Sequence, residues 1–426
     1  MKLLIKNGRV IDPANGIDDT RDILVEDGRI SQVAKNILTK DDKPKIIDAE
    51  DKIVMPGLVD MHVHLREPGR EDKETVFSAT SAALKGGVTA VLAMPNTTPA
   101  IDSPEGVDLL KDIIKKSALV DVFIAAAITK ARLGKELTDI QTLKGQGIAA
   151  ISDDGTSVES SELLSEAFRK ARENNLLVIC HCEDASLSGL GVVNLGLIST
   201  RLGLRGISKE SEYKRVERDI ELAQKFDAVL HIAHVSCGES VDIIARAKKN
   251  GVKVTAETAP HYFALTEEAV LDYDTNMKMK PPLRSKDDLE AVKQGLKNGV
   301  IDAIACDHAP HTENEKDIEF DRAEFGVIGL ETELAVSVTE LVYKGLLSWQ
   351  EVAEKLSLNP ARILGIDKGT LSIGSDADII IISPDKEWTV RKEEIISKSK
   401  NSPFLGKKLK GLVEYTICRG KIAYKS

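Results

Sequence analysis

The stretch Gly57-Leu58-Val59-Asp60-Met61-His62-Val63-His64-Leu65-Arg66 is an apolar run that ends in two histidines one residue apart. Since alternate residues of a strand face the same side, His62 and His64 can present their imidazoles to one point. Two neutral imidazoles that converge where a strand ends form an arrangement that binds zinc. A single His-x-His pair also occurs in protein cores and on protein surfaces, so the pair alone does not establish a metal site. The rest of the sequence is needed to choose between these interpretations.

Strand-like apolar runs recur along the chain after residue 56, and segments with apolar residues at helical spacing lie between them. Residues 162–174, for example, place charged residues opposite an apolar stripe. This alternation predicts an α/β fold, a parallel (β/α)8 barrel of the TIM type. The eight runs are residues 58–62, 88–93, 121–127, 148–152, 176–181, 228–234, 252–257 and 301–306.

The two ends of the chain differ from this pattern, because they hold short alternating runs broken by turn residues. Asn7-Gly8 and Asp27-Gly28 are dipeptides typical of hairpin turns. Similar alternation returns near the C-terminus. We therefore expect residues 1–55 and 362–426 to form one small β-sandwich domain beside a barrel of residues 56–361.

Charge and composition narrow the classes of function. The chain of 426 residues has 58 Lys and Arg against 68 Asp and Glu, a net charge of -10, and five cysteines. Nucleic acid is not expected as a partner, since no basic cluster with interleaved aromatic residues occurs. No apolar run reaches membrane-spanning length and the first residues do not resemble a secretory signal, so we expect no membrane association and a cytoplasmic location. An odd number of cysteines in apolar runs indicates reduced thiols.

Metal-ligating side chains recur where the predicted barrel strands end. The chemistry of (β/α)8 barrels lies at the carboxyl ends of the strands, so these side chains are expected to converge. A set of histidines and aspartates too large for one tetrahedral ion indicates a two-metal site, with ions about 3.5–4 Å apart. The candidates are His62, His64, Asp153, Asp154, His181, His234 and Asp307.

Two pairs of neighbouring candidates leave the choice of ligand open. His231 and His234 lie on the same run, and only one of them need be a ligand, while the other makes an ordinary hydrogen bond. Asp153 and Asp154 should point in opposite directions on a strand, and a turn or helix-cap role suits whichever one is not the ligand.

Other polar residues near the strand ends can also be explained without a role in the site. His308 and His311 follow the last strand-like run, where a solvent-facing loop position is as good an interpretation as a site. His261 is better explained as a packing or supporting residue than as a ligand. Arg66 would ordinarily be a surface charge, but two residues after His64 it becomes a candidate anion clamp, because guanidinium binds carboxylate through two parallel hydrogen bonds.

Seven motifs occur together: residues 57–68 (ending His62-Val63-His64-Leu65-Arg66-Glu67-Pro68), Met94-Pro95-Asn96-Thr97, Ser152-Asp153-Asp154-Gly155, His181-Cys182-Glu183-Asp184, His234-Val235-Ser236, Pro281-Pro282-Leu283-Arg284 and Asp307-His308-Ala309-Pro310-His311. In combination they closely resemble the type I dihydroorotases of the amidohydrolase superfamily, from one end of the chain to the other. The resemblance implies zinc-dependent, reversible cyclisation of N-carbamoyl-L-aspartate to L-dihydroorotate, an intermediate step of pyrimidine (UMP) synthesis.

The resemblance also implies two zinc ions per chain. One would be held by His62, His64 and Asp307 and the other by His181 and His234, with Asp154 bridging both. Many cyclic amidases of the superfamily bridge their metals with a carbamylated lysine, whereas type I dihydroorotases have an aspartate at this position, as here.

For the reaction, the resemblance implies attack by a metal-bridging hydroxide, with Asp307 as the general acid and base. Lys280 departs from the family, which often has asparagine before the two prolines, so a contact made by the asparagine amide cannot be made here in the same form. The implied substrate-binding residues are His64, Arg66, Asn96, Lys280, His311, Phe325 and Gly326.

Two other functions compete with this interpretation. A hydantoinase or allantoinase would share the barrel and the His-x-His pair, but it would leave Arg66 without a role and would use a lysine bridge. A non-catalytic partner of aspartate transcarbamoylase would be expected to lose metal ligands, and none is lost here. A homo-oligomer is expected, and aspartate transcarbamoylase is a candidate partner.

Overall fold

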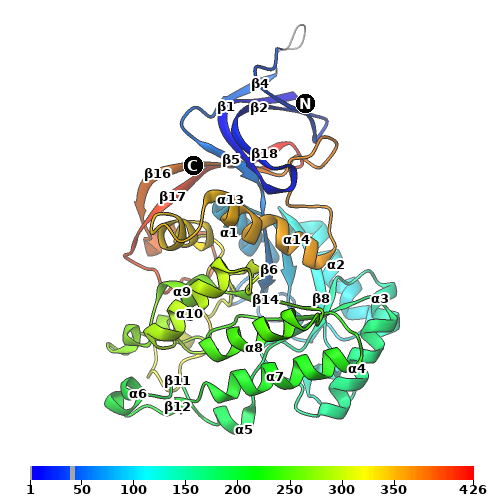
Figure 1. Cartoon of the computed structure of the whole chain (residues 1–426), viewed down its shortest axis with the longest axis vertical. Coiled ribbons are helices and arrows are strands. Elements are labelled where there is room, and N and C mark those ends of the chain that lie inside the picture. The colour runs from blue at the N-terminus through cyan, green and yellow to red at the C-terminus, as the bar shows by residue number, and fades with distance from the viewer. Residues whose placement is uncertain (1, 39–43) are drawn as a thin grey trace.

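The computed structural model describes residues 2–38 and 44–426, and it consists of a parallel barrel with a second sheet beside it (Figure 1). Each of the eight predicted runs overlaps one strand of the barrel. The barrel strands, which neighbour each other in chain order, are β6 (Leu58–Val63), β7 (Val88–Ala93), β8 (Asp121–Ala126), β9 (Ala150–Ser152), β10 (Leu177–Cys180), β13 (Leu230–Ile232), β14 (Val254–Thr258) and β15 (Ala303–Ile304).

The barrel closes between its first and last strands. Val63 forms a parallel bridge with His308, and the His64 N–H donates to the His308 carbonyl at 2.9 Å. Closure brings the residues that follow β6 and β15 side by side, although more than 240 positions separate them in sequence, as for His64 and Asp307 (243 positions). A sheet closed in this way leaves no exposed edge and directs all eight strand ends to one mouth.

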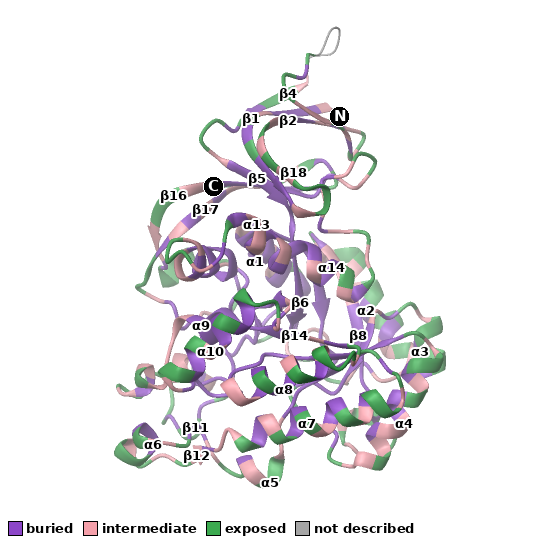
Figure 2. Ribbon diagram, in the orientation of Figure 1, coloured by how far each residue is buried: buried purple, intermediate pink, exposed green. Residues whose placement is uncertain are grey.

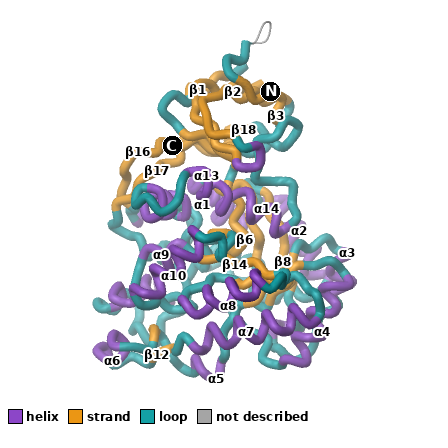
Figure 3. Tube along the Cα trace, in the orientation of Figure 1, coloured by secondary structure: helices purple, strands orange, loops and turns teal. Residues whose placement is uncertain are grey.

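Helices surround the barrel and cover its outer face (Figure 3). Their inward faces are buried and their outward faces exposed (Figure 2), which is the amphipathic pattern that the sequence predicts. In α1, Thr75 caps the first turn together with Ser78, and Gly87 ends the helix at a φ of 87°. The helices are α1 (Val76–Gly86), α2 (Pro104–Ser117), α3 (Ile140–Gly145), α4 (Ser161–Glu173), α5 (Ala185–Ser188), α6 (Leu197–Leu202), α7 (Glu210–Lys225), α8 (Gly238–Lys249), α9 (Pro260–Ala264), α10 (Lys286–Lys297), α11 (Glu313–Lys316), α12 (Glu333–Ser337), α13 (Trp349–Ala353) and α14 (Asn359–Leu364).

The two ends of the chain meet in a second eight-stranded sheet, as the sequence predicts. The central pairing joins β5 antiparallel to β16 and parallel to β1, so the chain's first and last segments share one sheet. Its strands are β1 (Lys2–Asp12), β2 (Ile17–Glu26), β3 (Arg29–Ala34), β4 (Lys45–Asp48), β5 (Ile53–Pro56), β16 (Ile379–Thr389), β17 (Lys408–Cys418) and β18 (Lys421–Lys425). A small two-stranded sheet, β11 (Val193–Asn194) with β12 (Gly206–Ile207), lies between α5 and α7.

One of the two predicted hairpin turns is wrong. Asp27 and Gly28 form the two-residue turn between β2 and β3, with φ values of 49° and 83° that suit such a turn. Asn7 and Gly8 instead lie inside β1, where the register with β2 shifts between Ile5 and Gly8. The dipeptide makes a bulge rather than a turn, because a residue with positive φ is also what a β-bulge requires.

Within the described residues, no helix is both long enough and apolar enough to cross a lipid bilayer.

Candidate metal centre

Strand β6 directs two imidazoles to the barrel mouth, and a fixed partner orients each of them. The Nδ1 of His62 lies 2.6 Å from a carboxylate oxygen of Glu257, and the Nδ1 of His64 lies 2.7 Å from the amide oxygen of Asn96. With Nδ1 donating to these oxygens, the Nε2 lone pair of each ring is free to bind a cation. Both histidines are buried, so their orientation is fixed by packing as well.

Asp154 lies between two groups of histidines, and its two carboxylate oxygens face different groups. Oδ2 lies 3.2 Å from Nε2 of His62 and 3.5 Å from Nε2 of His64. Oδ1 lies 3.5 Å from Nδ1 of His181 and 3.5 Å from Nε2 of His234. A carboxylate with one oxygen toward each group is the arrangement that a bridge between two ions requires.

Asp307 completes the group around His62 and His64. Its Oδ1 lies 3.0 Å from Nε2 of His64 and 3.7 Å from Nε2 of His62. On the other side of Asp154, Nδ1 of His181 lies only 2.8 Å from Nε2 of His234. The structure thus brings all six predicted ligand side chains together at one point of the mouth.

Geometry separates the neighbouring candidates that the sequence leaves open. Asp153 turns away from the centre and accepts hydrogen bonds from the Ile128 and Thr129 N–H groups at 2.8 and 3.0 Å. His231 also turns away, with Nδ1 2.8 Å from the Thr255 hydroxyl. Asp154 and His234 are therefore the members of the two pairs that face the centre.

The charges of the centre favour a cation. Burial raises the pKa of Asp307, but His62 and His64 outweigh that effect and hold it below its usual range. Burial lowers the pKa of His62, but the carboxylates of Asp154, Asp307 and Glu257 outweigh that effect and hold it well above its usual value. His62 thus lies among three carboxylates, whose negative charge a bound metal ion could neutralise in place of a proton.

The donor atoms fit a metal ion in spacing and in chemistry. Two ligands of a tetrahedral ion with bonds of about 2.0–2.2 Å lie roughly 3.4 Å apart, and the contacts of Asp154 with the four histidines span 3.2 to 3.5 Å. Moreover, Nε2 of His62 and Oδ1 of Asp154 are buried without a hydrogen-bond partner. Such unpartnered polar atoms are costly unless a ligand satisfies them.

Backbone strain concentrates at the same place. His234, Asp307 and Arg66 have φ values of 38°, 48° and 61°, in a region that non-glycine residues rarely adopt. Such conformations cost about 1–3 kcal/mol each and persist where the surrounding structure imposes them. Each of these residues lies two or three positions after the end of a barrel strand, so the strain reflects the turn that the chain makes there.

Sequence reasoning missed Glu257 as a supporting residue. One of its oxygens contacts His62, and the other lies 3.3 Å from Nε2 of His231, so the carboxylate lies between the two rings. Burial raises the pKa of Glu257, but the facing histidines, chiefly His62, bring it down to about 2. The available signal was an acidic residue on a strand-like run, Val254–Thr258, that is otherwise free of charged residues.

The predicted substrate-binding residues Arg66 and His311 lie together beside Asp307. The Arg66 Nε donates to the Pro310 carbonyl at 3.1 Å, and its Nη2 lies 3.3 Å from Nε2 of His311. His311 is buried, not a solvent-facing loop residue. Burial and the nearby cations, Arg66 first, lower the pKa of His311 to about 2, so its ring is neutral.

The segment at Phe325 and Gly326 is fixed against the same histidine. The Phe325 carbonyl lies 2.8 Å from Nε2 of His311, and Gly326 has a φ of 135°. A Cβ at Gly326 would lie 2.8 Å from the Cβ of Ala309 and 3.0 Å from Nε2 of His311. This close approach explains why glycine is needed there.

Lys280 lies at the mouth, where its amine pairs with a carboxylate. Its Nζ lies 2.8 Å from Glu183, whose other oxygen lies 3.8 Å from Nε2 of His181. Burial raises the pKa of Glu183, but His181 and Lys280 outweigh it and bring the pKa to about 2. Lys280 therefore does not simply replace the asparagine found in the family, because its charge is paired with Glu183.

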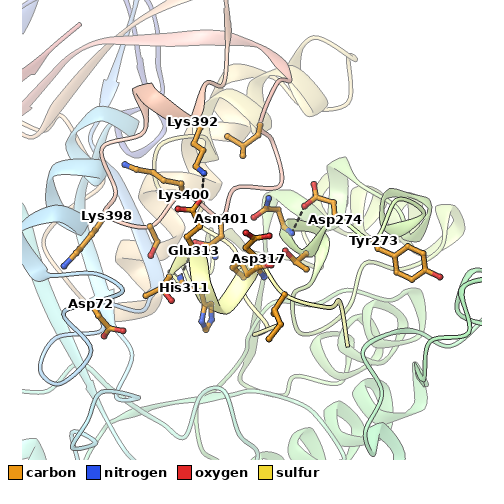
Figure 4. A pocket seen from close by; sticks show the side chains of 17 residues that line it. Asp72, Tyr273, Asp274, His311, Glu313, Asp317, Lys392, Lys398, Lys400 and Asn401 are labelled. Atoms are coloured by element: carbon orange, nitrogen blue, oxygen red, sulfur yellow. Dashed lines mark hydrogen bonds and ion pairs between the residues drawn. The ribbon is translucent and has the colours of Figure 1, made fainter. Parts of the chain in front are cut away.

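Behind His311 lies a separate cavity of about 620 Å³ (Figure 4). Among the described residues, His311 is the one predicted site residue on its wall, together with supporting residues such as Lys316 and Asn401. The Asn401 amide donates to the Gly326 carbonyl at 3.1 Å. The cavity therefore adjoins the substrate-binding segment and does not contain the predicted metal ligands.

Comparison with known proteins identifies the family. The profile described as Dihydro-orotase-like matches residues 51–240, and that of the Amidohydrolase family matches residues 341–424. The dihydroorotase of Elusimicrobium minutum is 54% identical over 422 residues, covering 99% of this chain and 97% of that protein. This chain belongs to the dihydroorotase family. A second dihydroorotase, from Geobacter metallireducens, is 50% identical over 425 residues and is covered in full, as is this chain.

Solved structures support the same architecture for this dihydroorotase-family chain. The L-hydantoinase (dihydropyrimidinase) of Arthrobacter aurescens superimposes with a TM-score of 0.89 at 25% identity, covering 99% of this chain and 95% of that one. The dihydropyrimidinase of Brevibacillus agri gives a TM-score of 0.87 at 25% identity. The predicted family and fold class are confirmed.

Proposed function

We propose that this chain is a zinc-dependent dihydroorotase that interconverts N-carbamoyl-L-aspartate and L-dihydroorotate in pyrimidine synthesis. Asp154 carries the proposal, because its two oxygens face separate groups of histidines within a chain 54% identical to a dihydroorotase. Two bound zinc ions would polarise the ring carbonyl and lower the pKa of water from about 15.7 to about 7. The residues that would hold them are His62, His64, Asp154, His181, His234 and Asp307.

Arg66 is the residue to which we assign the substrate carboxylate. Its Nε donates to the Pro310 carbonyl and its Nη2 lies against the neutral ring of His311, and no described carboxylate pairs with it, so its charge is available to an anion. Burial lowers the pKa of Arg66 to about 10, which leaves it charged at neutral pH. His311, Asn96 and the backbone at residues 325–326 would surround the ring.

Asp307 is the residue to which we assign the proton transfers. In hydrolysis, its carboxylate accepts a proton from the attacking water and donates it to the ring nitrogen as the carbon–nitrogen bond breaks. In ring closure the same proton moves in the opposite direction. General acid–base catalysis of this kind typically contributes about 10²–10⁴-fold to the rate.

Hydantoin or allantoin hydrolysis is a second candidate, because the structures with the same fold include hydantoinases. Two features argue against it. Aspartate rather than lysine lies between the histidine groups, and Arg66 offers a carboxylate-binding group that hydantoin and allantoin, which have no carboxylate, would not use. A purely structural role for the chain does not require six converging ligand side chains.

The test is to assay the purified protein in both directions, with hydantoin and allantoin as alternative substrates, before and after metal removal. Turnover of dihydroorotate and carbamoyl aspartate should be lost with chelation and restored by zinc, and elemental analysis should find two zinc ions per chain. The variants His62→Ala and His181→Ala should each lower metal content and rate. A folded, zinc-loaded protein that left both substrates unchanged would refute the proposal.

The predicted homo-oligomer, the aspartate transcarbamoylase partner and the cytoplasmic location stay predictions. So do the proposed boundaries between the small β domain, residues 1–55 with 362–426, and the barrel. Light scattering on the purified protein, alone and mixed with aspartate transcarbamoylase, tests the first two.

A further inference from the structure

Lys73 is a buried lysine next to the predicted substrate-binding residues, and the mechanism above gives it no role. It lies in the loop between β6 and α1, and only 5% of its surface is exposed. Its N–H donates to the Arg70 carbonyl at 2.9 Å, and its carbonyl accepts from the Ser399 hydroxyl at 2.7 Å. The backbone is thus fixed at this position. Because lysine is rarely buried without a partner, its contacts indicate what it does.

The Lys73 amine contacts a carboxylate and an imidazole. Its Nζ lies 2.9 Å from Oε1 of Glu315 and 3.0 Å from Nδ1 of His311. Arg70 and the Thr312 N–H hold Glu315 in turn, at 2.7 and 3.0 Å. Burial lowers the pKa of the Lys73 amine, but the adjacent Glu315 carboxylate opposes that shift and favours the charged form. Since an ammonium group only donates, Nδ1 of His311 is the acceptor of this hydrogen bond.

The other nitrogen of the His311 ring faces an acceptor. Nε2 lies 2.8 Å from the Phe325 carbonyl oxygen, which has no proton to donate. The ring is neutral and therefore carries one proton. That proton lies on Nε2, because Nδ1 faces a donor and Nε2 faces an acceptor. A proton on Nδ1 would need Glu315 as its acceptor, but Oε2 of Glu315 lies 3.6 Å away, too far for a hydrogen bond.

The position of this proton determines what Arg66 can bind. Nη2 of Arg66 lies 3.3 Å from Nε2 of His311. An unprotonated Nε2 would accept a hydrogen bond from the guanidinium and would present a lone pair to a carboxylate beside it. A protonated Nε2 leaves the guanidinium free and adds a second donor, and two adjacent donors match the oxygens of one carboxylate. An N–H can be shared between two acceptors, so the Phe325 carbonyl does not exclude a bound carboxylate.

We propose that Lys73 is a positioning residue for substrate binding, which holds His311 in the Nε2-protonated tautomer so that Arg66 and His311 offer two donors to the substrate carboxylate. This inference rests on the proposed function. The carboxylate concerned is the one that N-carbamoyl-L-aspartate and L-dihydroorotate both carry, and it takes no part in ring closure. Within the described residues, the Lys73 amine contacts no predicted metal ligand, so its effect on binding passes through His311.

The tautomer can be measured without turnover. Nitrogen-15 NMR of the zinc-loaded protein labelled in histidine distinguishes protonated from unprotonated ring nitrogens, and the signals lost in His311→Asn assign His311. We expect the proton on Nε2 in the parent, and no longer confined to Nε2 in Lys73→Met, because methionine cannot donate to Nδ1. A parent with the proton on Nδ1, or a Lys73→Met protein with the tautomer of the parent, would overturn the proposal.

Steady-state kinetics tests whether the tautomer matters for binding. Lys73→Met should raise KM for dihydroorotate and for carbamoyl aspartate by roughly tenfold, the effect of weakening one charge-assisted hydrogen bond. Zinc content should not change, and kcat should change less than KM. Lys73→Gln, whose amide can still donate to Nδ1, should recover part of the loss. In a His311→Asn background the Lys73→Met change should add little, because two residues that act through one contact are not additive.

Lys85→Met is the matched control. Lys85 also pairs with a glutamate, Glu331, at 2.8 Å, but this pair lies beside β17 and among none of the predicted site residues. The control variant should lose stability, as Lys73→Met does, and keep both KM values.

An unchanged KM in Lys73→Met, or an equal loss with and without His311, would overturn the role of Lys73. If Lys73→Met does not fold, Lys73→Gln takes its place. A KM that rises with any loss of the Nε2 proton then supports the proposal, and a KM independent of the tautomer overturns it. An inactive parent enzyme would refute the proposed function, whereas the tautomer measurement would still stand.

Discussion

At the scale of single residues, Arg66 offers the sharpest separation of substrate binding from metal binding. Replacing it with Met should raise KM for dihydroorotate by about 10- to 150-fold, because a hydrogen bond to a charged group contributes about 1.5–3 kcal/mol. Zinc content should not change, since Arg66 donates to Pro310 and contacts His311 but contacts no predicted ligand. Steady-state kinetics measures KM, and elemental analysis measures zinc content. An unchanged KM and turnover would contradict the assignment of Arg66 to the substrate carboxylate.

Glu257 is expected to act through His62 rather than on the substrate. Glu257→Gln should weaken zinc affinity or activity by about 10- to 100-fold, the usual effect of removing the partner that orients a metal-binding histidine. The physical reason is the 2.6 Å contact between the carboxylate and Nδ1 of His62. Zinc titration against a competing chelator measures the effect. Glu183→Gln is a useful comparison, because Glu183 lies 3.8 Å from its histidine and should matter less; equal affinities in Glu257→Gln and the parent would contradict the assignment.

At the scale of elements, the segment from Ala309 to Gly326 should behave as one rigid wall of the binding site. A methyl group in Gly326→Ala would meet Ala309 and His311, so the segment has to move. A displacement of about 1 Å near reacting groups can cost on the order of 100-fold in rate. We expect kcat/KM to fall toward that extent while zinc content is retained.

Gly345→Ala is the matched control for this segment. Gly345 also has a positive φ, 72°, but a Cβ there would meet nothing within 4 Å. It therefore imposes backbone strain without a clash. If both variants lost activity equally, backbone strain would explain the loss in Gly326→Ala, and displacement of the 309–326 segment would not.

At the scale of the whole molecule, Lys368 links the barrel to the sheet formed by the two chain ends. Its largely buried amine contacts Asp121, which begins β8, and lies 2.7 Å from Asp378 and 3.2 Å from Asp376, next to β16. Removing one partner of a fully buried charge pair costs about 3–5 kcal/mol, and the cost here should be smaller, because the Asp121 and Asp376 side chains are 25% and 34% exposed. Lys368→Met should therefore lower the thermal midpoint clearly in calorimetry.

The same cluster predicts a pH dependence. Burial lowers the pKa of Lys368, but Asp378 and Asp121 outweigh it and raise the pKa above its ordinary value. A lysine whose pKa is higher in the folded state contributes its full stability below its unfolded pKa, about 10.4, and loses it as pH rises further. The midpoints of parent and Lys368→Met should thus differ at pH 7 and converge at strongly alkaline pH. Lys392→Met, in an exposed pair with Glu313, should match the parent throughout.

The sequence by itself determined the barrel and the location of its chemistry. Short strand-like runs that alternate with segments of helical spacing depend only on local pattern, and each of the eight runs overlaps a barrel strand. The alternation of side chains along a strand also predicted that His62 and His64 lie on one side, because residues two apart face the same way.

Tertiary structure alone decided which side chains face the centre. Asp154 rather than Asp153, and His234 rather than His231, depend on how the chain turns after a strand ends, as the φ of 38° at His234 shows. Glu257 contacts His62 across 195 positions in sequence. Such contacts follow from the closure of the sheet, which no local pattern of residues encodes.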